Sequence, residues 1–333
     1  MSEHAIPVCV LTGFLGSGKT TMLGHLLRQQ EFARTAVIIN EFGEIGLDHE
    51  LVEASEDSIV ELATGCLCCK VRSDLTQTLQ ALLRRLDEGT CTPFERIVIE
   101  TSGLADPAPI LQTLMTDAAL AHRLALGEVV TTVDAIAGTL EREWVSQKQV
   151  ALADRIVLTK LDLDEAAEPS VRRRLAALNV CAPVLRADHG RIEPQTLLRA
   201  GLPDEQTTLE GRASPIEVGE QHAGHARDIR TYAILRDQPI RAVTLALFLE
   251  TLAEHCGSDL LRLKGIVNLI ESPDRPAVIH GVQHVFHAPS FLERWPSDDR
   301  RSRIVIIARH IPQRWVELLL EAIEEEVSEV ARL

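Results

Sequence analysis

Short apolar runs alternate with stretches of helical spacing along the first two thirds of the chain. Runs typical of β-strands cover residues 6–11, 35–40, 58–62, 96–100, 128–133 and 155–159. Between them, apolar positions recur every three or four residues, as in Leu75, Leu79, Leu82, Leu83 and Leu86. A helix at 171–178 and a strand at 183–186 carry the pattern to about residue 203. Because strands that alternate with helices form parallel βαβ units, the pattern predicts an α/β domain over residues 1–203 with a mostly parallel sheet.

The pattern changes after residue 203. Apolar periodicity lapses between 203 and 228, where Gly, Glu, Gln and Ser predominate, so we assign residues 204–227 to a linker. Beyond it, strand-like runs at 231–235, 261–270, 277–286 and 303–308 combine with helical patterns at 243–255 and 313–330. This β-α-β-β-β-α order predicts a smaller C-terminal α+β domain over residues 228–333 with an antiparallel sheet.

Composition narrows the classes of partner. The 333 residues are 45% hydrophobic, which is ample for two packed domains. The 49 acidic against 34 basic side chains give a formal net charge of −15, which argues against nucleic acid and against an anionic membrane surface as partners. No apolar run approaches the roughly 20 residues needed to span a bilayer, and the first residues lack the basic segment of a secretory signal. We therefore expect a cytoplasmic protein.

The first strand runs into a phosphate-binding motif. Residues 13–20 match G-x-x-x-x-G-K-[ST], with a strand before them and a helix after them. The glycines let successive backbone N–H groups point at phosphate oxygens, Lys19 would hold the β- and γ-phosphates, and the Thr20 hydroxyl would bind Mg²⁺. An ordinary glycine-rich strand-to-helix turn is the structural alternative. The nucleotide ligands predicted in this segment are Gly13, Gly16, Ser17, Gly18, Lys19, Thr20 and Thr21.

Residues 97–103 supply a second phosphate motif. The strand Ile97-Val98-Ile99 leads into E-T-S-G, which has the form of a D-x-x-G switch with Glu100 in the place of Asp. Glu100 could reach the magnesium ion through a water, and the Gly103 N–H could sense the γ-phosphate. A strand-end turn without chemistry is the alternative. Together with Lys19 and Thr20, these two residues form the predicted catalytic set.

The stretch Thr159-Lys160-Leu161-Asp162 favours guanine as the base. Guanine presents two adjacent donors, N1–H and the N2 amino group, and the Asp162 carboxylate can accept both, whereas adenine offers no equivalent pair. The stem of Lys160 would cover one face of the base. Alone, T-K-x-D is equally typical of a solvated loop, but its place after two phosphate motifs predicts GTP rather than ATP.

Three of the seven cysteines crowd into four positions, Cys66, Cys68 and Cys69. Thiolates bind Zn²⁺ and Cu⁺, and also Co²⁺. All three can converge on one ion only in a turn, which Gly65 permits, and a fourth ligand would come from elsewhere or leave an open position. Buried apolar cysteines and a reversible redox pair are the alternatives. The remaining cysteines, Cys9, Cys91, Cys181 and Cys256, are expected to be core or incidental thiols.

An acidic segment lies where a P-loop GTPase keeps its first switch. Glu41, Glu44 and Asp48 follow the strand at 35–40, and their carboxylates could serve Mg²⁺, a hydrolytic water or a second metal ion. A solvated acidic loop explains the same composition equally well.

Taken together, the motifs resemble one family. The set G-F-L-G-S-G-K-T, N-E-F-G-E, G-C-L-C-C, E-T-S-G-L-A-D-P and T-K-L-D, in this order, is similar to the CobW-like metallochaperone GTPases, in particular the YjiA-type members. The stretches L-L-R-L-K-G at 260–265, G-V-Q-H at 281–284 and R-S-R at 301–303 resemble the C-terminal domain of this family.

The resemblance implies slow GTP hydrolysis coupled to binding and delivery of a transition metal, usually zinc or cobalt, to a client metalloprotein. By position, it assigns phosphate and magnesium binding to residues 13–20 and the carboxylate of the second switch to Glu100. It assigns guanine binding to Lys160 and Asp162. It assigns Cys66, Cys68 and Cys69 as ligands of the transition metal, with Glu44 as a candidate further ligand. A nucleotide- or metal-dependent homodimer also fits. A P-loop kinase acting on a small molecule and a non-catalytic metal buffer are the rival functions.

Overall fold

The computed structural model describes residues 5–40, 59–61, 67–71, 75–194 and 229–331. They fall into two compact units, one formed by Met1–Arg173 with Ala182–Pro203 and one by Arg174–Cys181 with Asp204–Leu333. The linker predicted at 204–227 lies outside the described residues. Among the helices of the described ranges, none combines the length and the apolar character needed to cross a bilayer.

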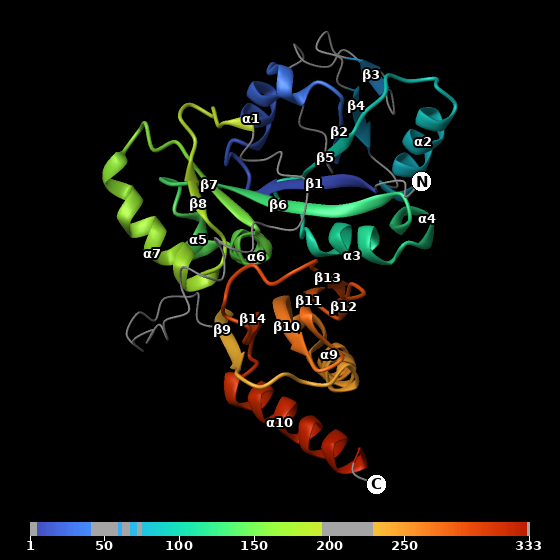
Figure 1. Cartoon of the computed structure of the whole chain (residues 1–333). Coiled ribbons are helices and arrows are strands. Elements are labelled where there is room, and N and C mark those ends of the chain that lie inside the picture. Colours follow the sequence, from blue (N-terminus) through green and yellow to red (C-terminus); the bar gives the residue numbers. More distant parts are fainter. Residues whose placement is uncertain (1–4, 41–58, 62–66, 72–74, 195–228, 332–333) are drawn as a thin grey trace. The chain divides into compact units, whose positions relative to one another are not determined.

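The first unit is built on one sheet whose strand order is β3-β4-β2-β5-β1-β6-β7-β8 (Figure 1). All neighbouring pairs are parallel except β3 with β4. The strands are β1 (Ile6–Gly13), β2 (Thr35–Asn40), β3 (Ile59–Glu61), β4 (Leu67–Val71), β5 (Arg96–Thr101), β6 (Leu124–Asp134), β7 (Arg155–Thr159) and β8 (Val184–Arg186). The predicted α/β class with a mostly parallel sheet is therefore confirmed.

Helices cover both faces of this sheet, with α1 on one face and α3 and α6 on the other (Figure 1). Under α1, a core cluster forms because the apolar positions of the helix meet those of β1, β2 and β5, including Leu11, Met22, Val37 and Val98. The helices are α1 (Lys19–Leu26), α2 (Leu75–Asp87), α3 (Ala108–Thr116), α4 (Ala118–Ala121), α5 (Thr139–Arg142), α6 (Trp144–Leu152) and α7 (Glu168–Leu178).

Two strands of the first unit differ from the sequence prediction. The segment Leu67–Val71 is strand β4, paired in parallel with β2, so the expected turn is wrong for residues 67–69. Strand β6 begins at Leu124 rather than near residue 128. Pairing with β1 starts at Leu124 and continues, after a register shift beside Gly127, to the end of the strand. A Cβ at Gly127 would lie 3.1 Å from the carbonyl oxygen of Val8. Strand pairing thus extends past a glycine and a glutamate that interrupt the apolar run.

The second unit is an antiparallel sheet of order β12-β11-β10-β14-β9, with β13 beside β11. Its core joins Phe248 and Leu252 of one helix to Val316 and Leu320 of the other and to the sheet residue Ile306. The predicted antiparallel α+β domain is confirmed, but the single strand predicted at 277–286 is wrong, because a turn divides this stretch into β11 and β12, which pair with each other. The elements are β9 (Ile229–Arg236), α9 (Ala242–Cys256), β10 (Leu260–Leu269), β11 (Ser272–Val282), β12 (Val285–Phe286), β13 (Ser290–Phe291), β14 (Ser302–Arg309) and α10 (Gln313–Val330).

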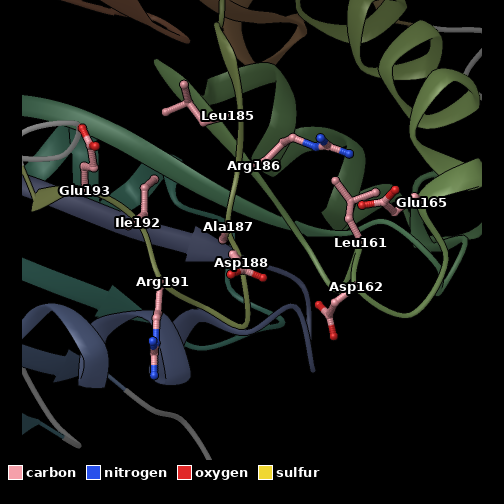
Figure 2. A pocket seen from close by; sticks show the side chains of 10 residues that line it. All are labelled: Leu161, Asp162, Glu165, Leu185, Arg186, Ala187, Asp188, Arg191, Ile192 and Glu193. Atoms are coloured by element: carbon pink, nitrogen blue, oxygen red, sulfur yellow. The ribbon is translucent and has the colours of Figure 1, made fainter.

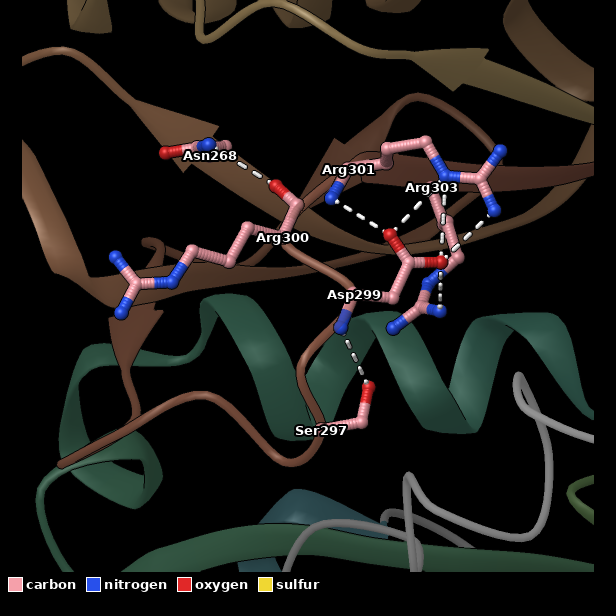
Figure 3. Close-up of polar contacts among 6 residues, drawn as sticks. All are labelled: Asn268, Ser297, Asp299, Arg300, Arg301 and Arg303. Atoms are coloured by element: carbon pink, nitrogen blue, oxygen red, sulfur yellow. Dashed lines mark hydrogen bonds and ion pairs between the residues drawn. The ribbon is translucent and has the colours of Figure 1, made fainter.

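A polar turn fixes the entry to β14 (Figure 3). Asp299 accepts hydrogen bonds from the backbone N–H and the guanidinium of Arg301, and it also pairs with Arg303 at 3.2 Å. The hydrogen bond from Arg301 is the largest cause that lowers the pKa of Asp299 to about 2. The amide of Asn268 donates to the Arg300 carbonyl at 3.0 Å, so the turn is tied to β10.

Candidate functional site

The predicted phosphate loop connects β1 to α1 in the middle of the first sheet. Gly18 precedes the helix with φ 88, a left-handed conformation that favours glycine. Gly13 has φ 144, and a Cβ there would overlap the carbonyl oxygen and the hydroxyl of Thr132. The loop is therefore pressed against the end of β6, and its glycines are required by backbone conformation and by close approach.

Lys19 is folded over the centre of this loop. Its Nζ donates to the carbonyl oxygens of Gly13 at 2.9 Å and of Phe14 at 3.3 Å, and the residue is only 8% exposed. A buried ammonium beside a helix N-terminus makes this loop a strong anion site. The arrangement fits the phosphate role predicted for Lys19.

The structure brings Thr20 and Glu100 together. Glu100 is the buried penultimate residue of β5, which pairs with β1 in a register that places Glu100 opposite Leu11. The hydroxyl of Thr20 donates to Oε1 of Glu100 at 2.5 Å. A hydroxyl and a carboxylate are the hard oxygen ligands that Mg²⁺ prefers, so the donor set at this position fits the predicted magnesium ion.

Hydroxyl groups tie the phosphate loop to the ends of β6 and β7. Ser17 Oγ and Thr132 Oγ1 lie 2.6 Å apart, and Thr159 Oγ1 donates to the carbonyl oxygen of Ser17 at 2.9 Å. The same Thr159 hydroxyl lies 3.2 Å from the Val133 carbonyl oxygen. Thr159 therefore links the predicted base motif directly to the phosphate loop. The sequence pattern gave no signal for Thr132.

Gly103 lies directly against the phosphate loop. A Cβ at this position would be 2.7 Å from the backbone nitrogen of Leu15, so no other residue fits without displacing the loop. The segment that contains the predicted γ-phosphate sensor is thus in contact with the phosphate loop.

Lys160 is held by a residue that the sequence analysis missed. Lys160 has φ 61, and its Nζ lies 2.7 Å from Oδ2 of Asp134, at the end of β6. Burial opposes ionisation of Asp134, but the hydrogen bonds from Lys160 and from the backbone N–H groups of Ile136 and Ala137 outweigh it, so its pKa lies below the ordinary value. The only signal in the sequence was an aspartate at the end of an apolar strand.

Asp162 borders a cavity of about 490 Å³ (Figure 2). Its Oδ2 lies 3.3 Å from Nδ1 of His189, a residue with φ 47 whose side chain is largely exposed. The walls come from the loop after β7, from β8 and from the loop after β8, and the contribution of the last two was not expected from the motifs. The lining residues are Leu161, Asp162, Glu165, Leu185, Arg186, Ala187, Asp188, Arg191, Ile192 and Glu193.

Two of the four predicted transition-metal residues lie outside the described ranges. Cys66 and Glu44 are not among the described residues, whereas Cys68 and Cys69 belong to strand β4 and pair in register with Val37 and Ile38 of β2. Within the described side chains, no group of three or more His, Cys, Asp or Glu could hold a metal ion. The metal role of these residues stays a prediction.

Two of the other cysteines pack in the cores, where Cys256 is buried and Cys9 is partly buried. Burial is the main cause that raises the pKa of Cys9 to about 12, and the nearby carboxylates of Glu128 and Asp154 act in the same direction. Burial also raises the pKa of Cys256 to about 11. Both thiols therefore stay protonated near neutral pH, which suits a packing role and does not suit metal binding.

The parallel sheet, the phosphate loop after β1 and the antiparallel second unit define a P-loop NTPase fold with an added α+β domain. The chain belongs to the CobW/HypB/UreG family, since its sequence matches the nucleotide-binding domain of that family over residues 7–186. Residues 229–324 match the cobalamin synthesis protein cobW C-terminal domain. The resemblance drawn from the motifs is confirmed.

Individual relatives agree with this placement. The chain is 34% identical to the zinc chaperone YjiA of Escherichia coli K12 over 93% of this chain and 96% of that protein. It is 34% identical to the zinc-regulated GTPase metalloprotein activator 1 of Schizosaccharomyces pombe over 56% of this chain and 47% of that protein. The crystal structure of the Zn(II)-bound YjiA GTPase from Escherichia coli matches with a TM-score of 0.73 and 32% identity, covering 96% of this chain and 99% of that one.

Proposed function

We propose that this protein is a GTP-hydrolysing metal chaperone of the cytoplasm. In this proposal it binds zinc at Cys66, Cys68 and Cys69, with Glu44 as a further candidate ligand, and couples its nucleotide state to delivery of the ion to a client metalloprotein. Zinc is favoured over cobalt by the names of the relatives, which include a zinc chaperone and a zinc-regulated GTPase activator of metalloproteins.

The nucleotide half of the proposal is carried by the contact between Thr20 and Glu100. These residues come from the two predicted phosphate motifs, and their oxygens lie 2.5 Å apart at the mouth of the phosphate loop. In the GTP complex, Lys19 would turn from the loop carbonyls to the phosphate oxygens, while Thr20 and Glu100 hold Mg²⁺. Magnesium, when bound, neutralises charge on the β- and γ-phosphates. Lys160 and Asp162 would bind the guanine.

Coupling to the metal is supported by the register of the sheet. Val37 of β2 pairs with Cys68 of β4 on one side and with Val98 of β5 on the other, two residues before Glu100. Two strand spacings and a two-residue offset correspond to about 12 Å between the backbones at Cys68 and Glu100. The thiol segment and the second phosphate motif are thus joined through one intervening strand. A nucleotide-dependent shift at Glu100 can therefore be transmitted to the thiol segment through the one strand between them.

The proposal is tested by separating the two activities. Lys19→Ala should abolish GTP hydrolysis and leave zinc affinity within about twofold, because the ammonium binds phosphate and is not one of the proposed zinc ligands. Cys66→Ala should weaken zinc binding and leave hydrolysis intact. Cys91→Ala, which removes a half-buried thiol outside the motif, is the matched control and should change neither property. If Lys19→Ala or Cys66→Ala removes both activities in folded protein, the scheme is wrong.

Zinc affinity measured by chelator competition tests the coupling itself. A chaperone must bind the ion with different affinity in its two nucleotide states, so a GTP analogue and GDP should give different zinc dissociation constants. Equal constants would favour a metal buffer. Transfer of the γ-phosphate to a small molecule, instead of release of inorganic phosphate, would favour a kinase. The domain limits 1–203 and 228–333 and the homodimer stay predictions.

A further inference from the structure

A buried glutamine on α6 contacts the second phosphate motif. Gln149 is fully buried, and its Nε2 donates to the carbonyl oxygens of Gly103 at 3.3 Å and of Ala105 at 3.0 Å. Its own backbone carbonyl accepts a hydrogen bond from Thr131 Oγ1 of β6 at 2.9 Å. One side chain anchored in the core therefore holds two peptide groups of the loop that follows β5.

The orientation of this amide is fixed by chemistry. Only the NH₂ end of a glutamine can face two carbonyl oxygens, because the opposite orientation would bring three acceptors together. The Oε1 atom is buried and has no hydrogen-bond partner among the described residues. An unpartnered buried acceptor is unfavourable, so the position of Gln149 is explained by its donor group and not by packing alone.

The preceding residue of α6 contacts the same loop. Lys148 Nζ lies 2.6 Å from Oδ2 of Asp106, and the lysine side chain is 14% exposed. Oδ1 of the same carboxylate accepts the backbone N–H of Ala108, in the first turn of α3. Consecutive side chains of α6 thus bind both ends of the segment 103–106.

The loop has little freedom on its other side. Gly103 touches the phosphate loop so closely that a Cβ would lie 2.7 Å from the backbone nitrogen of Leu15. The segment is therefore enclosed between the phosphate loop and the two side chains of α6. Leu104 within it remains 58% exposed, so apolar burial contributes little to its position.

We propose that Gln149, assisted by Lys148, is the positioning residue that holds Gly103 where its N–H can meet the γ-phosphate. The inference rests on the proposed GTP binding. It adds a residue that raises the affinity for GTP relative to that for GDP. Without the two hydrogen bonds, ordering the loop would consume part of the free energy of GTP binding, so the affinity for GTP would fall. GDP lacks the γ-phosphate that contacts the loop, so its affinity would not change.

Gln149→Met tests this role, with Gln147→Met as the matched control. Gln147 lies on the same helix, is 4% exposed and donates through Nε2 to the Leu140 carbonyl at 2.8 Å, away from residues 103–106. The two variants therefore lose the same kind of buried bond. Lys148→Met, at a less buried position, provides a second variant that should fold readily.

Binding of a fluorescent non-hydrolysable GTP analogue and of fluorescent GDP is measured for each variant. Gln149→Met should weaken analogue binding by about tenfold and change GDP binding by less than about twofold. Lys148→Met should act in the same direction but more weakly, and Gln147→Met should leave the ratio of the two affinities unchanged. An equal loss for both nucleotides, tighter analogue binding in Gln149→Met, or the same change of ratio in Gln147→Met would overturn the proposal.

Amide hydrogen exchange separates this inference from the proposed function. In protein without nucleotide, Gln149→Met should accelerate exchange in the peptide that covers residues 103–106, and Gln147→Met should not. Unchanged exchange would refute the positioning role whether or not GTP binds. If the unmodified protein binds neither nucleotide but exchange responds as expected, the positioning of the loop by Gln149 stands and the proposed GTPase function fails.

Discussion

The hydroxyl of Thr20 and the carboxylate of Glu100 meet at 2.5 Å although 80 positions separate them in the chain. The contact exists because β1 and β5 are neighbours in the sheet and both end at the same edge. In a parallel sheet that edge collects the side chains that follow the strands, and ligands bind there. The short distance between the two oxygens fits the magnesium ion that we propose for this position.

Replacing Glu100 by Gln should raise the Mg²⁺ concentration needed for GTP hydrolysis by about 10- to 100-fold, because a charged ligand or ligand support is lost. Hydrolysis measured against magnesium concentration provides the test. Glu128→Gln is the control, since it also removes a buried carboxylate, one that pairs with Arg155. It should lower stability without changing the magnesium requirement. An unchanged magnesium requirement in Glu100→Gln would remove Glu100 from the metal site.

The ion pair between Asp134 and Lys160 predicts a pH dependence. The folded-state pKa of Asp134 lies below its unfolded value of about 3.9, so the carboxylate contributes stability that is fully present above that pH. This contribution should be lost as the pH falls through the lower folded-state pKa. The free energy of unfolding should therefore drop less steeply with acidification in Asp134→Asn than in the unmodified protein. Chemical denaturation between about pH 2 and 6 measures this, and identical slopes would contradict the assignment.

Thiol alkylation should divide the cysteines into two classes. Cys9 and Cys256, with pKa values of about 12 and 11, carry almost no thiolate at pH 8 and are shielded by the core. We expect them to react with iodoacetamide only after denaturation. Cys66, Cys68 and Cys69 should react in the metal-free protein and be protected by zinc, as measured by mass spectrometry of the peptides. Protection of none of the three would remove zinc from the proposed site.

Much of the fold was predictable because its signals are local. Strand β7 (Arg155–Thr159) and helix α10 (Gln313–Val330) have the bounds that apolar spacing indicated, since each is a continuous pattern. Strand β4 was missed because it is defined by its pairing with β2. Its cysteines led to the prediction of a metal-binding turn. The periodicity of apolar residues does not show which strands pair with one another.

By itself, the sequence was enough to identify the phosphate loop, the second phosphate motif and the base motif, because each is a short contiguous segment with its own chemistry. Only the tertiary structure decided which residues support them. Asp134 holds Lys160, Thr159 binds the Ser17 carbonyl and Gln149 holds Gly103, in each case between segments distant in the chain. These contacts follow from the strand order β5-β1-β6-β7, which sets the ends of separate strands side by side. A linear pattern does not specify that order, and the hydrogen bonds exist only once the sheet has formed.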